Sequence, residues 1–227
     1  MFVGTQFPVR SDTDYEVLAQ LGVNHINGFP PGEAASWTAD VLSEYREKVE
    51  SFGISVDMVA LPIGTKPEDG LSPNITLGIS PERDREIETC QEIIRACAAA
   101  GIPAVKYRLF IIGITRTEPK RGRGGALRSS FYWDEVDQDE PPGAWGTVSA
   151  DEYWERIDYF LERVVPVAEE NKVLPIGGGL YTGLYPQEAK ERKAHLDRAE
   201  KSMNAAADRL SESRNQENPR AAERRAE

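Results

Sequence analysis

The sequence predicts an α/β protein whose strands form a parallel sheet, either doubly wound or closed as a (β/α)8 barrel. Short runs of β-branched and aromatic residues alternate with segments of helical periodicity from the N-terminus to about residue 176. The turns from helix to strand are short and contain glycine, whereas the loops from strand to helix are longer. A chain of 227 residues is also long enough to bury a sizeable core.

Five strands are expected in chain order. They share short apolar or β-branched runs and lie at 2–7, 23–29, 54–61, 102–112 and 173–176. Four helices separate them, at 12–21, 36–52, 81–101 and 149–172. Ser80 followed by Pro81, and Ser149 three residues before Glu152, are typical of helix starts.

Charge and cysteine content narrow the classes of partner and compartment. The formal net charge of -11 argues against a nucleic-acid-binding protein, which needs a basic face. Cys90 and Cys97 lie two turns apart on one predicted helix, too far for a disulfide, so we expect buried thiols in a reducing compartment. No signal-like segment opens the sequence and no apolar run reaches about 18 residues, so we expect a soluble cytoplasmic protein that does not enter a membrane.

The regular alternation stops after the fifth strand. Three glycines follow at 177–179, and the remaining sequence is rich in charges of both signs. We therefore expect a partial (β/α) barrel domain at 1–185 and a charged helical or disordered tail at 186–227.

A long loop after the fourth strand contains the sequence RTEPKRGRGG at 116–125. In parallel α/β proteins ligands bind at the carboxyl ends of the strands, and this loop follows one of those ends. Arginine binds a carboxylate or phosphate through two parallel hydrogen bonds, and glycines let backbone N–H groups approach the anion. Arg116, Lys120 and Arg123 are therefore candidates for binding a small anion. A solvated basic loop without a ligand is the alternative.

Other kinds of site receive less support from the residues. The aromatic run at 131–133 suggests single-stranded RNA, but the acidic residues that follow it would repel a phosphate backbone. His25, near the end of the second strand, can face a site or be an ordinary strand histidine. No Cys/His cluster indicates zinc, and Asp57 lies too early in its strand for a metal ligand, so no metal ligands can be assigned.

The segment VKYRLFIIGITRTEPKRGRGGALRSSFYWDEVD, at 105–137, resembles a strand and loop of mannonate dehydratase and its relatives in the xylose-isomerase-like TIM-barrel group. The matching positions are Tyr107, 116–118 and 122–126. The opening strand–helix pattern and the helix WERIDYFLERVVPVAEENKV are also similar, so the resemblance covers about residues 1–173.

The resemblance implies a (β/α)8 barrel that removes water from D-mannonate, giving 2-keto-3-deoxygluconate, with a divalent metal such as Mn2+. Arg116 and Arg123 would bind the carboxylate of this small anionic sugar acid, and Lys120 and His25 are further substrate-binding candidates. Tyr107 would donate a proton or contact a hydroxyl group.

The sequence departs from the family near residue 174. The family continues into a strand with a His-Pro element and later metal ligands, whereas here Val173 is followed by LPIGGG. Four or five strands cannot close an eight-stranded barrel. We therefore expect a chain truncated after about residue 173, inactive if the metal ligands are missing, whose sheet edges another chain or a second copy would cover. A sugar isomerase or epimerase of the same barrel group, or a non-catalytic fragment or subunit, are the alternatives.

Overall fold

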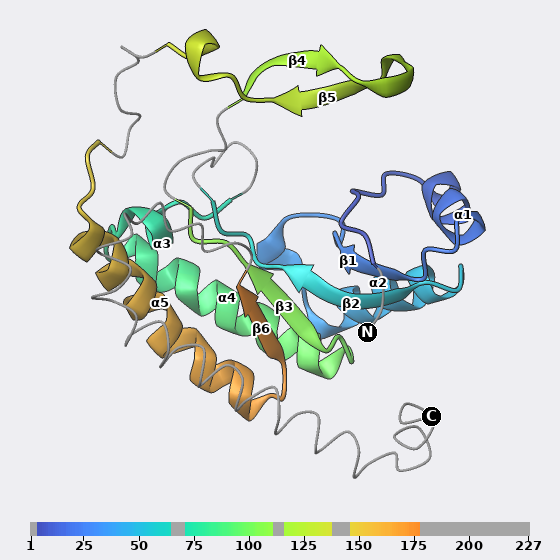
Figure 1. Ribbon diagram of the computed structural model, residues 1–227. Coiled ribbons are helices and arrows are strands. Elements are labelled where there is room, and N and C mark those ends of the chain that lie inside the picture. The colour runs from blue at the N-terminus through green and yellow to red at the C-terminus, as the bar shows by residue number, and fades with distance from the viewer. Residues whose placement is uncertain (1–3, 65–70, 111–115, 138–145, 178–227) are drawn as a thin grey trace, which may run out of the picture.

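The computed structural model describes residues 4–64, 71–110, 116–137 and 146–177, and its helices and strands alternate along the chain (Figure 1). The α-helices are α1 (Asp12–Gln20), α2 (Ala39–Glu50), α3 (Asn74–Leu77), α4 (Glu82–Ala99) and α5 (Ala150–Glu170). The main sheet contains β1 (His25–Gly28), β2 (Ser55–Ala60), β3 (Ala104–Tyr107) and β6 (Leu174–Gly177). A second sheet contains β4 (Thr117–Arg121) and β5 (Leu127–Ser130). Short 3-10 helices are η1 (Ala34–Ser36), η3 (Arg123–Gly125) and η4 (Trp133–Glu135).

The main sheet is parallel and has the strand order β1-β2-β3-β6. Thr5 forms a parallel bridge to Ile26, so the N-terminal segment extends the sheet beyond β1. The predicted parallel sheet with helical connections is thereby confirmed. The strand expected at 2–7 is reduced to this bridge, and residues 1–3 and the expected tail at 186–227 lie outside the described residues.

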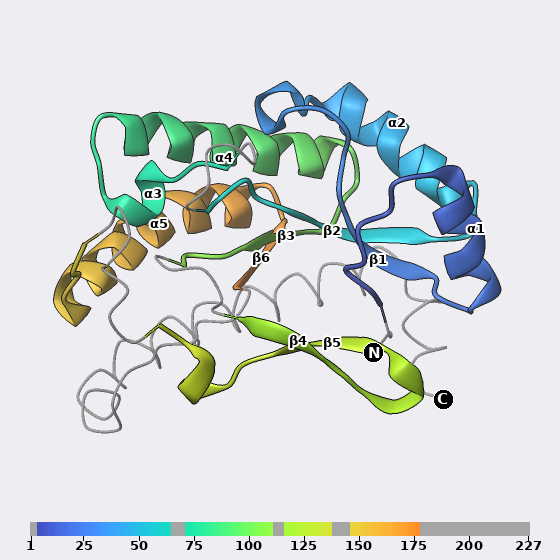
Figure 2. The same ribbon diagram turned by 90° about the horizontal axis from the view of Figure 1, so that it is seen from above.

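The helices pack on one face of the main sheet, and the core lies between the two layers. Figure 2 shows α2 and α4 on one side of the sheet, with α5 beside α4. Val59 and Val105 of the sheet are fully buried under these helices, and Phe160 of α5 is fully buried as well. The ring centroid of Phe160 lies 5.6 Å from that of Tyr107. Burying each such aliphatic or aromatic side chain stabilises the fold by roughly 1.5–3 kcal/mol.

The helix starts follow local side-chain chemistry. At α5 the Ser149 hydroxyl accepts a hydrogen bond from the Glu152 N–H (3.3 Å), and the Glu152 carboxylate accepts one from the Ser149 N–H (2.8 Å). At α4 the expected serine cap does not form. The cap residue is Pro81, and the Ser80 hydroxyl donates instead to the Asp84 carboxylate at 3.3 Å.

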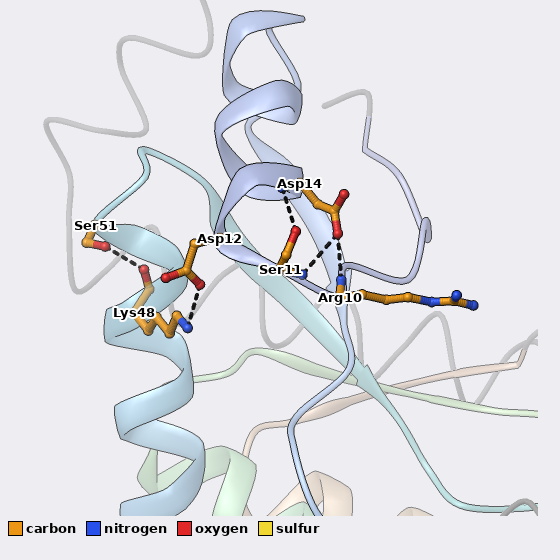
Figure 3. A network of polar contacts seen from close by, with 6 residues as sticks. All are labelled: Arg10, Ser11, Asp12, Asp14, Lys48 and Ser51. Carbon is orange, nitrogen blue, oxygen red and sulfur yellow. Dashed lines mark hydrogen bonds and ion pairs between the residues drawn. The ribbon is translucent and has the colours of Figure 1, made fainter.

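Helix α1 is held at its first turn by the polar network in Figure 3. Asp14 accepts hydrogen bonds from the backbone N–H groups of Arg10 (2.8 Å) and Ser11 (3.0 Å). The Lys48 ammonium of α2 lies 2.6 Å from the Asp12 carboxylate and joins the two helices.

The long loop after β3 contains a β-hairpin, 116–137, that the sequence analysis did not predict. Strand β4 pairs antiparallel with β5, and Gly124 and Gly125 in the turn adopt positive φ angles of 68° and 78°. The residues of both strands are mostly exposed, so they lack the apolar alternation that marks a half-buried strand. The hairpin lies beyond the carboxyl ends of β3 and β6 (Figure 1), on the side of the sheet away from α2 and α4 (Figure 2).

Candidate functional site

The face of the main sheet opposite the helices carries a group of polar side chains. Tyr107 packs on Phe160 on the helix side, and because side chains alternate along a strand, Lys106 lies on the opposite side. Arg108 follows the strand directly and is exposed between the buried Tyr107 and Leu109. On β1 and β2 the alternation is interrupted by an irregular register between Ile26 and Asn27, and the aliphatic side chains of Ile26, Val56 and Val59 are buried. We call this surface the open face; its polar residues are Gln6, His25, Asn27, Asp57, Lys106 and Arg108.

His25 and Asp57 form an ion-pair contact between β1 and β2. The His25 Nδ1 lies 3.0 Å from Oδ2 and 3.1 Å from Oδ1 of Asp57. The side chains are 18% and 38% exposed, so solvent reaches both of them. A carboxylate in this position fixes the orientation of the imidazole ring. The Asp57 carboxylate thus orients the His25 ring on this face of the sheet.

Asn27 lies two residues after His25 on β1. Its side chain is 8% exposed, and its Oδ1 finds no hydrogen-bond partner among the described residues. A buried amide oxygen without a donor costs about 1–3 kcal/mol. A donor from a water molecule or a ligand would remove that cost.

Two cations lie at the carboxyl end of β3. The Lys106 Nζ donates a hydrogen bond to the Gln6 Oε1 at 2.5 Å. Partial burial, and to a smaller extent the neighbouring Arg108 guanidinium, lower the pKa of Lys106 below its ordinary value. Arg108 is exposed. In the described parts of the chain, neither cation is paired with a carboxylate.

The hairpin holds the three predicted anion-binding residues, Arg116, Lys120 and Arg123. The Lys120 Nζ lies 2.5 Å from the Glu135 Oε1 and 5.1 Å from the centroid of the Tyr132 ring. The hydrogen bond to Glu135 raises the pKa of Lys120, and its charge is already balanced within the hairpin. Arg116 precedes β4 and Arg123 lies in the turn, and both are exposed.

The predicted residues do not all meet on one surface. Tyr107 is 2% exposed, its ring packs against α5, and burial raises its pKa. His25 lies on the opposite side of the sheet, and Arg116 and Arg123 lie on the hairpin. The structure therefore gathers the three hairpin cations in one element and separates Tyr107 from His25.

Four residues of the open face, Gln6, Asn27, Lys106 and Arg108, were not predicted from the sequence, and one was set aside. Asp57 was judged too early in its strand, but the parallel register brings it beside His25. Two cations at alternate positions of an otherwise apolar strand, as in VKYRL, are a signal that could have identified Lys106 and Arg108.

The described residues do not fit a complete metal site. Across 4–64, 71–110, 116–137 and 146–177, no group of three or more His, Cys, Asp or Glu side chains could hold a metal ion. His25 and Asp57 supply two ligands, and Cys90 and Cys97 are buried in the core. Within the same residues, no helix is long and apolar enough to cross a membrane.

The chain is similar in sequence to enzymes named mannonate dehydratase. It is 26% identical over 175 residues to mannonate dehydratase 1 of Halalkalibacterium halodurans, covering 63% of this chain and 46% of the relative. It is 27% identical over 202 residues to the mannonate dehydratase of Thermotoga neapolitana, covering 72% of this chain and 53% of the relative. The chain thus spans about half the length of the curated relatives it matches. No protein-family model matches it.

A solved structure has a similar fold. The mannonate dehydratase from Streptococcus suis serotype 2 matches 78% of this chain and 53% of its own length, with a TM-score of 0.63 and 23% identity. The fold is therefore that of a (β/α) barrel protein, of which the described residues form a part, as the sequence predicted. By sequence, the chain is similar to members of the mannonate dehydratase family, and the predicted resemblance to that family is confirmed.

Proposed function

We propose that this protein takes part in the removal of water from a sugar acid, converting D-mannonate to 2-keto-3-deoxygluconate. The observation that carries the proposal is the similarity over 202 residues to an enzyme named mannonate dehydratase. The open face supports it, because acid–base and cationic groups lie on the side of the sheet that forms the interior of a (β/α) barrel.

The reaction takes a proton from C2 and the hydroxyl group from C3, which leave together as water, and the enol that remains becomes the 2-keto group. It needs a proton acceptor and cations that hold the carboxylate while C2 loses its proton. We assign the proton exchange to His25, because Asp57 holds its ring through Nδ1. Arg116 and Arg123 remain candidates for binding the carboxylate, whereas Lys120 already pairs with Glu135.

The predicted role of Tyr107 as a proton donor requires its hydroxyl to reach the substrate. Because its ring lies between the sheet and α5, we propose that Tyr107 positions its neighbours on β3 from the helix side instead. The Tyr107→Phe variant tests this assignment. We expect this variant to form product at the wild-type rate. A decrease of about 100-fold in that rate, with an intact fold, would show that Tyr107 acts as a proton donor.

Metal, location and assembly belong to the same proposal. The resemblance implies a divalent metal such as Mn2+, but His25 and Asp57 are too few ligands among the described residues, so we assign it no step. We propose a cytoplasmic location and one folding unit at 1–185. We also propose contact with another chain or a second copy, because β6 and the Thr5 segment are the unpaired edges of the described sheet.

The experiment is to incubate the purified chain with D-mannonate, with and without Mn2+, and to measure the 2-keto-3-deoxy product. The His25→Gln variant, prepared in parallel, controls for contaminating enzyme and is expected to lose at least about 100-fold in rate. A ketose–aldose interconversion assay on the same samples separates a dehydratase from a sugar isomerase or epimerase. Equal rates from both proteins, or no product from folded wild type, would remove the proposal.

A further inference from the structure

We propose that Lys106, Arg108 and Gln6 form a binding site for the carboxylate of a small organic anion at the carboxyl end of β3. The identification of that anion as a sugar acid rests on the proposed function. The cation pair itself is a feature of the open face and does not depend on the dehydration reaction.

The position of the two cations is set by the packing behind them. Tyr107, which lies between them in sequence, is held against Phe160 on the helix side. The Tyr153 hydroxyl of α5 donates a hydrogen bond to the Leu109 carbonyl, which fixes the chain just after Arg108. Because the chain is anchored on both sides of Arg108, the two cationic side chains leave the same short stretch of backbone.

The hydrogen bonding of Lys106 is incomplete within the described residues. An ammonium group has three donors, and the Lys106 Nζ uses one of them on the neutral amide oxygen of Gln6 at 2.5 Å. Gln6 thus orients the ammonium group without neutralising it. A carboxylate could accept from the remaining donors and from the planar Arg108 guanidinium, which binds carboxylates through two parallel hydrogen bonds.

The surroundings favour an anion over a cation or a neutral molecule. The partners of Lys106 in the sheet register are Ala60 on β2 and Ile176 on β6, which bring no charge to its sides. Partial burial lowers the pKa of Lys106, and the nearby Arg108 guanidinium lowers it further, because two like charges at one site repel each other. A bound carboxylate would offset that repulsion, and this chain otherwise carries a net charge of -11.

The hairpin also carries cations, but they are less well arranged to bind a carboxylate. Lys120 is paired with Glu135, and the Arg121 guanidinium donates to the Gly125 carbonyl at 3.3 Å. Arg123 is a single exposed cation in a turn. Lys106 and Arg108, on either side of the buried Tyr107 at the end of β3, are therefore the better preorganised site.

The test is binding of D-gluconate to the purified chain, measured by calorimetry, with D-glucose as the uncharged control. We expect gluconate to bind and glucose not to bind at about 10 mM. The Lys106→Gln and Arg108→Gln variants should each weaken gluconate binding about tenfold or more, since each removes a charge-assisted hydrogen bond. Arg95→Gln, an exposed cation of α4, removes the same charge elsewhere and should leave the affinity within about twofold.

Two results would overturn the site: gluconate affinity unchanged in both β3 variants with intact folds, or affinity lost in Arg123→Gln and kept in Lys106→Gln. Circular dichroism and thermal melting establish that each variant folds. The dehydration assay separates this inference from the proposed function. If gluconate binding requires Lys106 but the chain forms no keto product, the binding site is supported and the proposed dehydratase function is contradicted. If the Lys106→Gln variant forms product with an unchanged KM, the proposed function is supported and the binding site is contradicted.

Discussion

The imidazole Nδ1 of His25 lies 3.0 Å from the Asp57 carboxylate, although the two residues are 32 positions apart in the sequence. Parallel pairing of β1 with β2 brings them together, with His25 opposite Ser55 in the register. Both side chains are accessible to solvent, and an isolated pair of this kind contributes little to stability, about 0–1 kcal/mol. The proposed role of this pair in proton exchange can therefore be tested separately from its contribution to folding.

Asp57→Ala should therefore lower activity far more than stability. We expect product formation to fall by about 100-fold, because the ring loses its orientation, while the free energy of unfolding changes by less than about 1 kcal/mol. Steady-state kinetics and urea unfolding measure the two effects. Asp57→Asn is the matched control, since its amide oxygen can still accept from Nδ1. A variant that unfolds but keeps its rate per folded molecule would contradict the assignment.

Gly28 leaves room for the packing between β1 and α2. A Cβ added there would lie 2.9 Å from Tyr45 Cε1 and 2.9 Å from Val56 Cγ1, which is too close for either contact. We expect Gly28→Ala to destabilise the protein by about 1–3 kcal/mol through overpacking. Gly122→Ala is the control, because its nearest neighbour would be 3.5 Å away. Chemical denaturation measures both, and equal midpoints for the two variants would contradict the steric explanation.

Phe160 joins α5 to the sheet and is fully buried. Phe160→Ala would leave a cavity beside Tyr107, and we expect a loss of about 3–5 kcal/mol in the free energy of unfolding. Leu127→Ala, on the exposed hairpin, removes a side chain that is 67% exposed and should change stability by less than about 0.5 kcal/mol. Thermal melting compares them. A small decrease in stability in Phe160→Ala would mean that the packing of α5 on the sheet does not depend on this side chain.

Stability should fall in acid. Hydrogen bonds, chiefly from the Ser149 hydroxyl, lower the pKa of Glu152 below its ordinary 4.5. A carboxylate with a lower pKa in the folded state stabilises the fold above its unfolded pKa, and that contribution disappears as the pH falls through the folded pKa. Two other carboxylates with lowered pKa values, Asp14 and Asp84, act in the same direction.

Urea midpoints measured from pH 7 down to about pH 3 test this expectation. Glu152→Gln cannot ionise at this position, so it should be less stable than wild type at pH 7 and approach it in acid. A constant difference between the two proteins across that range would show that the Glu152 charge does not contribute.

Much of the fold could be predicted because its signals are local. Capping serines, glycine stops and runs of β-branched residues identified four parallel strands and the four longer helices. The strand expected at 102–112 ends at Tyr107, and the one expected at 2–7 is a single bridge at Thr5. The hairpin at 116–137 was missed because strands exposed on both faces carry no apolar alternation. The short helix α3 was missed as well, since its four residues lie in a segment rich in proline and glycine.

By itself, the sequence determined the class of fold, the resemblance to a family and the presence of a basic segment, because periodicity, composition and motif spacing are properties of neighbouring residues. Only the tertiary structure decided which functional side chains lie on the same surface. Strand register paired His25 with Asp57, and alternation put Lys106 on the open face while turning Tyr107 into the core. These outcomes depend on contacts between segments far apart in the chain, and a one-residue change of register would reverse each of them.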